Sequence, residues 1–333
     1  MRITRDTLLN IARDTVAQRT RLDRNLIAVY LSGALLEDSF LLGGTADIDL
    51  FFIHTDDAPV GREIVRLTDE VHLDIAHHRY TDYRNTRTLR VDAWLGPVLK
   101  GCRSLYDPQH FLDFTIASVR GQFDRADHVL ERAQTQADTA RRIWLSFHNQ
   151  PFEQGTAQVT EYLRAVSSAA NAIASLSGGP LTERRFLLTD PARAASVGKP
   201  GLHAGLLGLL GAPNLEEDVL PTWIPLWQAA YQAVPEEGRP VRLHPHRLVY
   251  YRQAFLELLK GNQPQTLLWP LLHTWTMAVS VQPPAPQILV AWRQAFEYLG
   301  LLGKAFDERL AALDAYLDMV EETLEIWGRK AGV

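Results

Sequence analysis

The N-terminal third of the chain alternates between a helical pattern and short apolar runs. Segment 7–18 repeats apolar residues one helical turn apart, which predicts an amphipathic helix. The run 26–31 is short, apolar and partly β-branched, and it ends at Ser32-Gly33. It therefore predicts a buried strand that leads into a tight turn. A short helix, a glycine turn and a second strand at 48–54 are expected to follow.

A third strand is predicted at 71–77, where apolar and polar residues alternate with period two. This alternation places His72 and Asp74 on one face of the strand. The opposite face carries apolar residues, namely Val71, Leu73 and Ile75. The three predicted strands and the helix make this part of the chain mixed α/β.

Helical patterns replace the strand patterns in the second half of the chain. Apolar residues at spacings of three and four predict helices over 159–176 and 306–327. The apolar stripe of the last helix fits the buried side of a bundle helix, and a dimer seam is the alternative. Glycine and proline concentrate at 198–213 and 282–286, which we interpret as loops between helices.

These patterns predict an α+β fold. We expect a mixed-sheet α/β domain at 1–115 and an all-α helical bundle at 116–333, which agrees with a chain of 333 residues. The contents of 46% hydrophobic and 22% charged residues are typical of a globular protein. With one cysteine, Cys102, the chain holds neither an internal disulfide nor a cysteine-based zinc cluster, and we expect a structural role for it.

Charge and hydropathy narrow the classes of partner and location. The net charge of -5 disfavours duplex nucleic acid as a partner, because phosphate binding needs clustered positive charge. No apolar run reaches the roughly 18 residues that a membrane span needs, so we expect no membrane partner. The first residues lack the apolar segment of a secretory signal, which favours a cytoplasmic location. The oligomeric state stays open.

Two carboxylates in the second strand carry the clearest chemistry. Asp47 and Asp49 share one face of that strand, while Ile48, Leu50 and Phe52 turn toward the core. Two carboxylates so close repel each other, and a divalent cation removes this conflict. Magnesium takes a few such oxygen ligands and also holds substrate phosphates. The alternative is a pair of surface carboxylates on an exposed strand.

The Ser32-Gly33 turn comes at the end of the preceding strand. Glycine lets the backbone approach a bound group closely, and backbone N–H groups at such a turn can hold an anion. A phosphate and a metal ion are therefore expected to meet across neighbouring strands.

This segment resembles the nucleotidyltransferase superfamily related to DNA polymerase beta. The family's signature is Gly-Ser after a strand, then Asp-hydrophobic-Asp on the next strand, matched here by Gly33 and by Asp47 with Asp49. A third family carboxylate, on a later strand, corresponds to Asp74. The resemblance implies that the three aspartates are catalytic and bind two Mg²⁺ ions. It also implies that Ser32 and Gly33 contact a nucleoside triphosphate, and that Asp74 completes the metal site or accepts a proton.

The resemblance implies a magnesium-dependent transfer of a nucleoside monophosphate to an acceptor hydroxyl, and the net charge favours a small-molecule acceptor. The helical half is similar in layout to enzymes that adenylylate aminoglycoside or lincosamide antibiotics, whose helical domain helps to bind the acceptor. Ala34 stands where the family has serine. The alternative is therefore a catalytically degenerate member that acts as a binding or regulatory partner, as an antitoxin does.

Other polar residues have simpler interpretations. We expect His77 to pack on the apolar side of its strand and His72 and His78 to share the face of Asp74, without metal ligation by any of them. A phosphate could be reached by arginines of the helical half, namely Arg164, Arg184 and Arg185. Glu153 and Glu161 are candidate general bases, although structural roles are the simpler interpretation.

Overall fold

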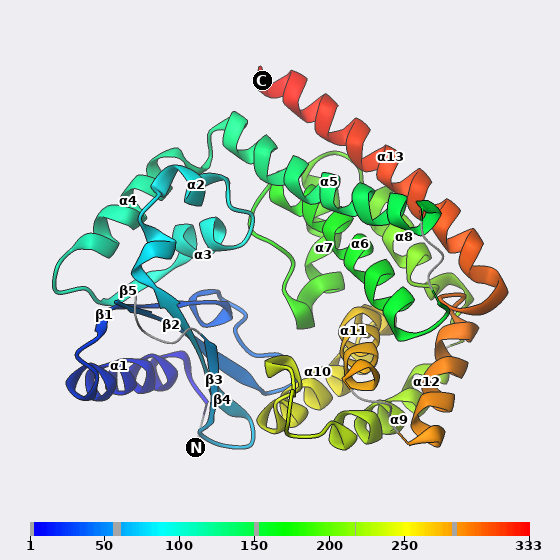
Figure 1. Cartoon of the computed structure of the whole chain (residues 1–333), viewed down its shortest axis with the longest axis horizontal. Coiled ribbons are helices and arrows are strands. Elements are labelled where there is room, and N and C mark those ends of the chain that lie inside the picture. Colours follow the sequence, from blue (N-terminus) through cyan, green and yellow to red (C-terminus); the bar gives the residue numbers. More distant parts are fainter. Residues whose placement is uncertain (1–2, 56–60, 150–152, 217, 282–284) are drawn as a thin grey trace. The chain divides into compact units, whose positions relative to one another are not determined.

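The computed structural model describes residues 3–55, 61–149, 153–216, 218–281 and 285–333. Its fold is α+β, with one mixed sheet and many helices (Figure 1). The chain divides into two compact units, Met1–His128 and Val129–Val333, and each is described by itself. No helix in the described ranges combines the length and apolar character needed to cross a membrane.

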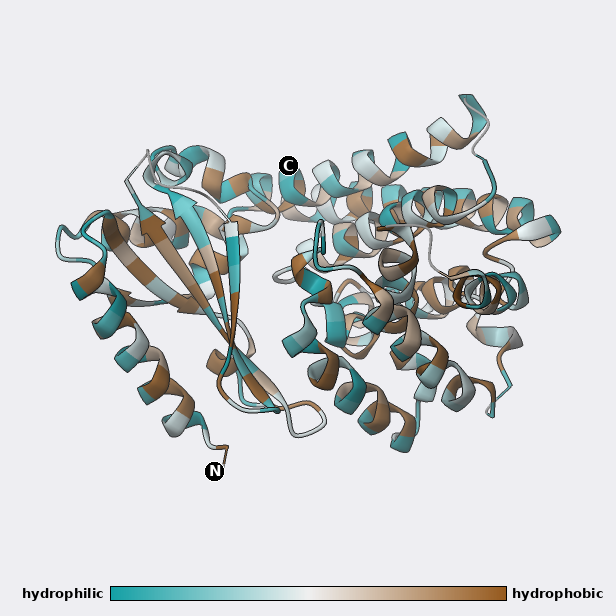
Figure 2. Cartoon of the chain, turned by 60° about the horizontal axis from the view of Figure 1, so that its bottom comes forward, coloured by the Kyte–Doolittle hydropathy of each residue, from teal (hydrophilic) through white to brown (hydrophobic). Residues whose placement is uncertain are grey.

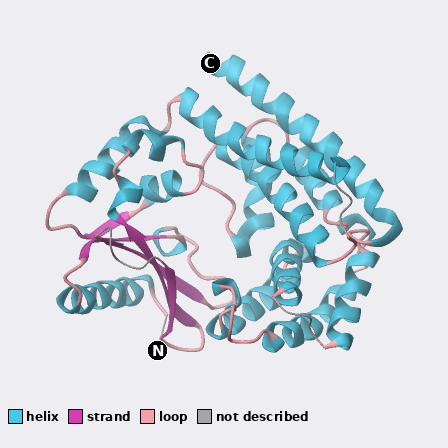
Figure 3. Cartoon of the chain, in the orientation of Figure 1, coloured by secondary structure: helices cyan, strands magenta, loops and turns pink. Residues whose placement is uncertain are grey.

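A five-stranded sheet forms the centre of the first unit among the residues described (Figure 3). Its strands are β1 (Leu26–Ser32), β2 (Ala46–His54), β3 (Gly61–Arg66), β4 (Val71–Arg79) and β5 (Arg103–Tyr106). They lie in the order β3-β4-β2-β1-β5. Strands β2 and β4 pair in parallel, and the other neighbours pair antiparallel. The sequence predictions of β1, β2 and β4 are confirmed.

Helix α1 (Arg5–Leu22) covers one face of this sheet. Thr4 caps its start by accepting a hydrogen bond from the Thr7 N–H at 3.2 Å. Its apolar residues lie one turn apart and are buried with β2 side chains such as Leu50 in one core cluster. Figure 2 shows the resulting alternation of hydrophobic and hydrophilic positions along α1. The predicted N-terminal helix is therefore confirmed.

Three further helices cover the opposite face of the sheet, and their bounds are α2 (Thr86–Val91), α3 (Leu95–Gly101) and α4 (Phe111–Phe123). Their buried residues form a second core cluster with Tyr30 of β1 and Ile53 of β2. A 3₁₀ turn, η1 (Ala34–Leu36), links β1 toward β2 where a short helix was expected. Because helices bury both faces, a polar group within the sheet needs a specific partner.

The described residues of the second unit contain helices and no strand. The helices are α5 (Ala126–Asn149), α6 (Thr156–Ser175), α7 (Phe186–Ser196), α8 (Gly201–Leu209), α9 (Val219–Ala233), α10 (Leu248–Lys260), α11 (Leu268–Ser280), α12 (Pro286–Tyr298) and α13 (Phe306–Ala331), of which α5 begins just before the unit boundary. The apolar stripe of α13 packs on α6 and α8, with Leu313, Leu317 and Val320 fully buried. The stripe is therefore the buried side of a bundle helix.

The interpretation of 198–213 as a loop is wrong. Helix α8 occupies most of that segment and buries Leu202, Leu206 and Leu209 at helical spacing. Its glycines made this pattern look like a loop. Gly205 lies against the Tyr316 ring, which a side chain at that position would crowd. Most of the second predicted loop, residues 282–284, lies outside the described residues.

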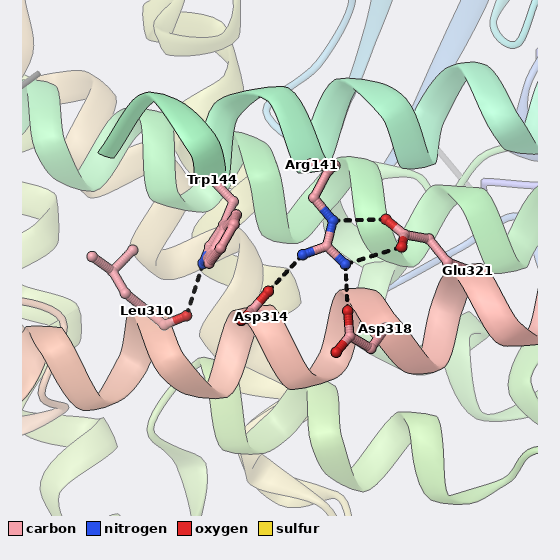
Figure 4. A network of polar contacts seen from close by, with 6 residues as sticks. All are labelled: Arg141, Trp144, Leu310, Asp314, Asp318 and Glu321. Atoms are coloured by element: carbon pink, nitrogen blue, oxygen red, sulfur yellow. Dashed lines mark hydrogen bonds and ion pairs between the residues drawn. The ribbon is translucent and has the colours of Figure 1, made fainter. Parts of the chain in front are cut away.

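Helices α5 and α13 are joined by a cluster of charges (Figure 4). The guanidinium of Arg141 on α5 contacts three carboxylates of α13, at 2.5 Å from Asp314, 2.6 Å from Asp318 and 2.7 Å from Glu321. The Trp144 indole N–H donates to the Leu310 carbonyl at 3.1 Å. The hydrogen bonds from Arg141 to Glu321, Asp318 and Asp314 raise the pKa of its guanidinium. One cation therefore offsets the repulsion among three acidic side chains.

Candidate active site

The three candidate aspartates converge on one face of the sheet. Asp49 of β2 is the register partner of Asp74 on the parallel strand β4, and Asp47 lies two residues earlier on β2. The side-chain period of two gives all three the same face. One carboxylate oxygen from each lies within 4.8 Å of the others. The sequence placed these residues on strands, and the register between strands brings them together.

The apolar residues between the aspartates fix the direction of the carboxylates. Ile48 and Leu50 are fully buried on the α1 side, so Asp47 and Asp49 must point to the other face. Asp74 is 1% exposed, and the side chain of Asp49 is 19% exposed. Three carboxylates so little exposed repel one another strongly unless cations stand beside them.

Gly33 brings the backbone against the Asp49 carboxylate. Ser32 ends β1 as the register partner of Asp49, and Gly33 follows with φ of 81°, a left-handed conformation that favours glycine. A β-carbon at Gly33 would overlap Oδ2 of Asp49. Glycine is therefore required for conformation and for space. The two residues expected to contact nucleotide lie beside the carboxylate cluster, with Ser32 largely buried.

A positively charged residue that the sequence analysis missed also belongs to the site. Arg62 on β3 donates a hydrogen bond from Nε to Asp74 Oδ1, and its Nη2 lies 4.0 Å from Asp49 Oδ1. Strand β3 pairs antiparallel with β4, and this pairing brings Arg62 across to the aspartates. Sequence spacing alone gives no sign of it, because the link depends on strand pairing.

The three histidines of β4 lie where the alternation predicted. His77 is on the α1 side, where its ring contacts Phe52 and its Nδ1 forms a hydrogen bond with His54 Nε2 at 2.9 Å. His72 is buried on the carboxylate face. His78 is on that face too, and burial lowers its pKa.

Beyond the carboxylates, the same face becomes aromatic. The Tyr30 ring stacks on Phe51 with centroids 4.7 Å apart. The Tyr30 and Tyr83 hydroxyls are hydrogen-bonded at 2.9 Å, and the Tyr83 hydroxyl is 2.9 Å from His78 Nδ1. Burial raises the pKa of both tyrosines, so both phenols stay neutral. This packed end of the face supports β2 and β4 behind the aspartates.

Two of the arginines considered in the helical half, Arg164 and Arg184, contact residues of their own unit. Arg184 is buried, and its Nη1 donates to the Tyr250 carbonyl at 3.1 Å. Arg164 pairs with Glu161 at 3.1 Å. These contacts support structural roles for Arg184, Arg164 and Glu161.

Cys102 is buried, and its thiol lies 3.2 Å from the Leu99 carbonyl. Burial raises the pKa of the Cys102 thiol to about 11. A thiol with so high a pKa is a poor nucleophile at neutral pH, which agrees with the structural role expected for it.

A second group of metal-type side chains lies at the start of α4. They are Asp107, which is partly buried, and His110 and Asp113, which are exposed. Asp107 accepts the Asp113 backbone N–H at 2.8 Å, as residues at a helix start do. This local role accounts for the grouping.

The chain matches no family model and shows no significant match to a curated protein.

Proposed function

We propose that this chain is a divalent-metal-dependent nucleotidyltransferase, with its N-terminal unit in the nucleotidyltransferase fold. The observation that carries the proposal is the convergence of Asp47, Asp49 and Asp74 beside Gly33. Gly33 directly follows a strand, the aspartate pair lies on the next strand along the chain, and Asp74 lies on a later one. These are the positions that the resembled family uses, which supports the fold and the activity together.

The donor set suits magnesium. Carboxylate oxygens in small number, on a rigid strand pair, are hard ligands that leave coordination positions for phosphate oxygens. Asp47, Asp49 and Asp74 would hold Mg²⁺, with two ions expected once nucleotide binds. When bound, the metal neutralises charge on the phosphates and favours ionisation of the attacking hydroxyl.

The residues of the chain would divide the remaining work. Asp47 and Asp49 would hold the cation that neutralises the triphosphate end of the nucleotide, and the backbone at Gly33 would let a phosphate approach the sheet. In the resembled family the third carboxylate lies beside the attacking oxygen, so Asp74 would take the proton of that oxygen. The acceptor oxygen then bonds to the α-phosphorus while the bond to the β-phosphate oxygen breaks, so pyrophosphate leaves.

A small molecule is the favoured acceptor, because the net charge is -5 and the sequence shows no basic stripe. The second candidate function is a binding or regulatory protein that retains the fold without turnover. Ala34 favours it, since no side-chain hydroxyl follows Gly33 for a phosphate.

Nucleotide binding and turnover separate the two candidates. Calorimetry with each nucleoside triphosphate, with Mg²⁺ or with EDTA, measures metal-dependent binding. Pyrophosphate release with a panel of hydroxylated small molecules measures turnover. Binding with release supports the transferase, and binding without release for any acceptor supports the regulatory protein. Absence of metal-dependent nucleotide binding would reject the transferase.

A further inference from the structure

The guanidinium of Arg62 lies against the candidate metal cluster. It bonds Oδ1 of Asp74 and stands 4.0 Å from Oδ1 of Asp49, and both carboxylates belong to the candidate metal cluster. Neither residue comes from the strand that carries Arg62. The contact is therefore a product of the folded sheet.

The three neighbouring carboxylates need a positive charge beside them. Asp74 is almost fully buried and shares its surroundings with two other carboxylates. Without a nearby positive charge, this arrangement would destabilise the folded sheet. Arg62 supplies one charge permanently, because a guanidinium stays protonated at all ordinary pH values.

The same contact opposes a divalent ion. A metal ion bound to Asp74 and Asp49 would share these carboxylates with the guanidinium, and the two cations would repel each other. The Arg62 side chain is 42% exposed on an edge strand, so it has room to turn toward solvent.

We propose that Arg62 is the resident counterion of the aspartate cluster, and that a divalent cation must displace it to bind. This inference rests on the metal site of the proposed function and adds its regulation. It makes the site selective against weakly bound free cations, since each must outcompete an attached positive charge. Arg62 is thus a positioning residue for the carboxylates, which it holds together in the metal-free state.

Mn²⁺ binding to the full chain without nucleotide is the direct test, measured by electron paramagnetic resonance of free Mn²⁺. Arg62→Gln is expected to bind Mn²⁺ on the order of tenfold more tightly than the unmodified chain. The matched control is Arg66→Gln. Arg66 lies four residues along the same strand and pairs with Asp69, so this change alters net charge equally outside the cluster. Its dissociation constant should stay within about twofold of the original.

A second variant and a second measurement keep the test valid if Arg62→Gln folds poorly. Arg62→Lys keeps the positive charge but loses the planar guanidinium. Its Mn²⁺ affinity should therefore lie between those of the unmodified chain and Arg62→Gln. Mn²⁺ should also raise the melting temperature of Arg62→Gln more than that of the unmodified chain.

The outcomes separate this proposal from the proposed function. Equal or weaker Mn²⁺ binding by Arg62→Gln and Arg62→Lys, with binding by the unmodified chain, overturns the counterion role and leaves the metal site standing. Tighter binding without nucleotide turnover keeps the counterion role and counts against the transferase. Absence of Mn²⁺ binding in every variant overturns both.

Discussion

The α-carbon of Gly33 faces the Asp49 carboxylate so closely that no β-carbon fits between them. Gly33 also has φ of 81°. Gly33→Ala should therefore lower the free energy of unfolding by about 2 to 4 kcal/mol, from backbone strain and from displacement of Asp49. Urea denaturation measures this loss.

Gly44→Ala is the matched control for that change. Gly44 has φ of 73°, but a β-carbon there meets nothing within 4 Å. Its cost should be about 1 to 2 kcal/mol, from strain alone. Equal losses in the two variants would mean that the contact with Asp49 has no energetic weight.

Removal of Arg141 should destabilise the helical unit. Arg141→Met leaves Asp314, Asp318 and Glu321 without their shared cation, at an expected cost of about 1 to 3 kcal/mol at low salt. The loss should shrink in 1 M NaCl, because salt screens the repulsion. Arg142→Met, a change at the exposed neighbour on α5, is the control. A salt-independent loss, or the same loss in both variants, contradicts an electrostatic role.

The burial of His54, next to His77, predicts a loss of stability in acid. Burial, and then the charge of His77, lowers the pKa of His54 from its usual 6.5 in the folded chain. The unfolded chain therefore binds this proton more readily, so the free energy of unfolding falls as the pH decreases below about 6.5. His54→Gln should flatten the decline between pH 7 and pH 5. His110→Gln, a change at an exposed histidine, should keep the full decline. If the free energy of unfolding fell equally with pH in the unmodified chain and in both variants, His54 would not be the group responsible.

Much of the sheet could be predicted from sequence, and the reasons are local. Strands β1, β2 and β4 are apolar or strictly alternating, so their pattern carries the information. Strands β3 and β5 were not predicted, because both lie at edges of the sheet. Strand β3 is polar, and β5 has only four residues. Helix α8 was not predicted, because its glycines are typical of a loop sequence.

Only part of the candidate site could be predicted from the sequence, because only part of it is local in the chain. Asp47, Asp49 and Gly33 are close in sequence and follow the strand period, so their grouping is local. The link to Arg62 depends on an edge strand that the sequence did not reveal, and on its pairing with β4. Pairing between strands is set by tertiary structure, which one sequence does not display.

Asp74 should matter more for turnover than for nucleotide binding. Asp74→Asn keeps the side-chain shape and removes the proton acceptor, so the rate should fall by about a hundredfold to ten-thousandfold. Nucleotide affinity should change much less, as calorimetry with the triphosphate would measure. Loss of nucleotide binding as complete as in Asp47→Asn would instead make Asp74 chiefly a metal ligand. Full activity would remove it from the site.

The most direct measurement of the central claim is Mg²⁺-dependent pyrophosphate release by three proteins under identical conditions. They are the unmodified chain, Asp49→Asn, and Asp69→Asn as a control on an exposed carboxylate that pairs with Arg66. We expect release by the unmodified chain and by Asp69→Asn, abolished by EDTA, and at least about a hundredfold less from Asp49→Asn with an unchanged circular dichroism spectrum. Equal release by all three proteins, or release that persists without a divalent cation, would contradict the account.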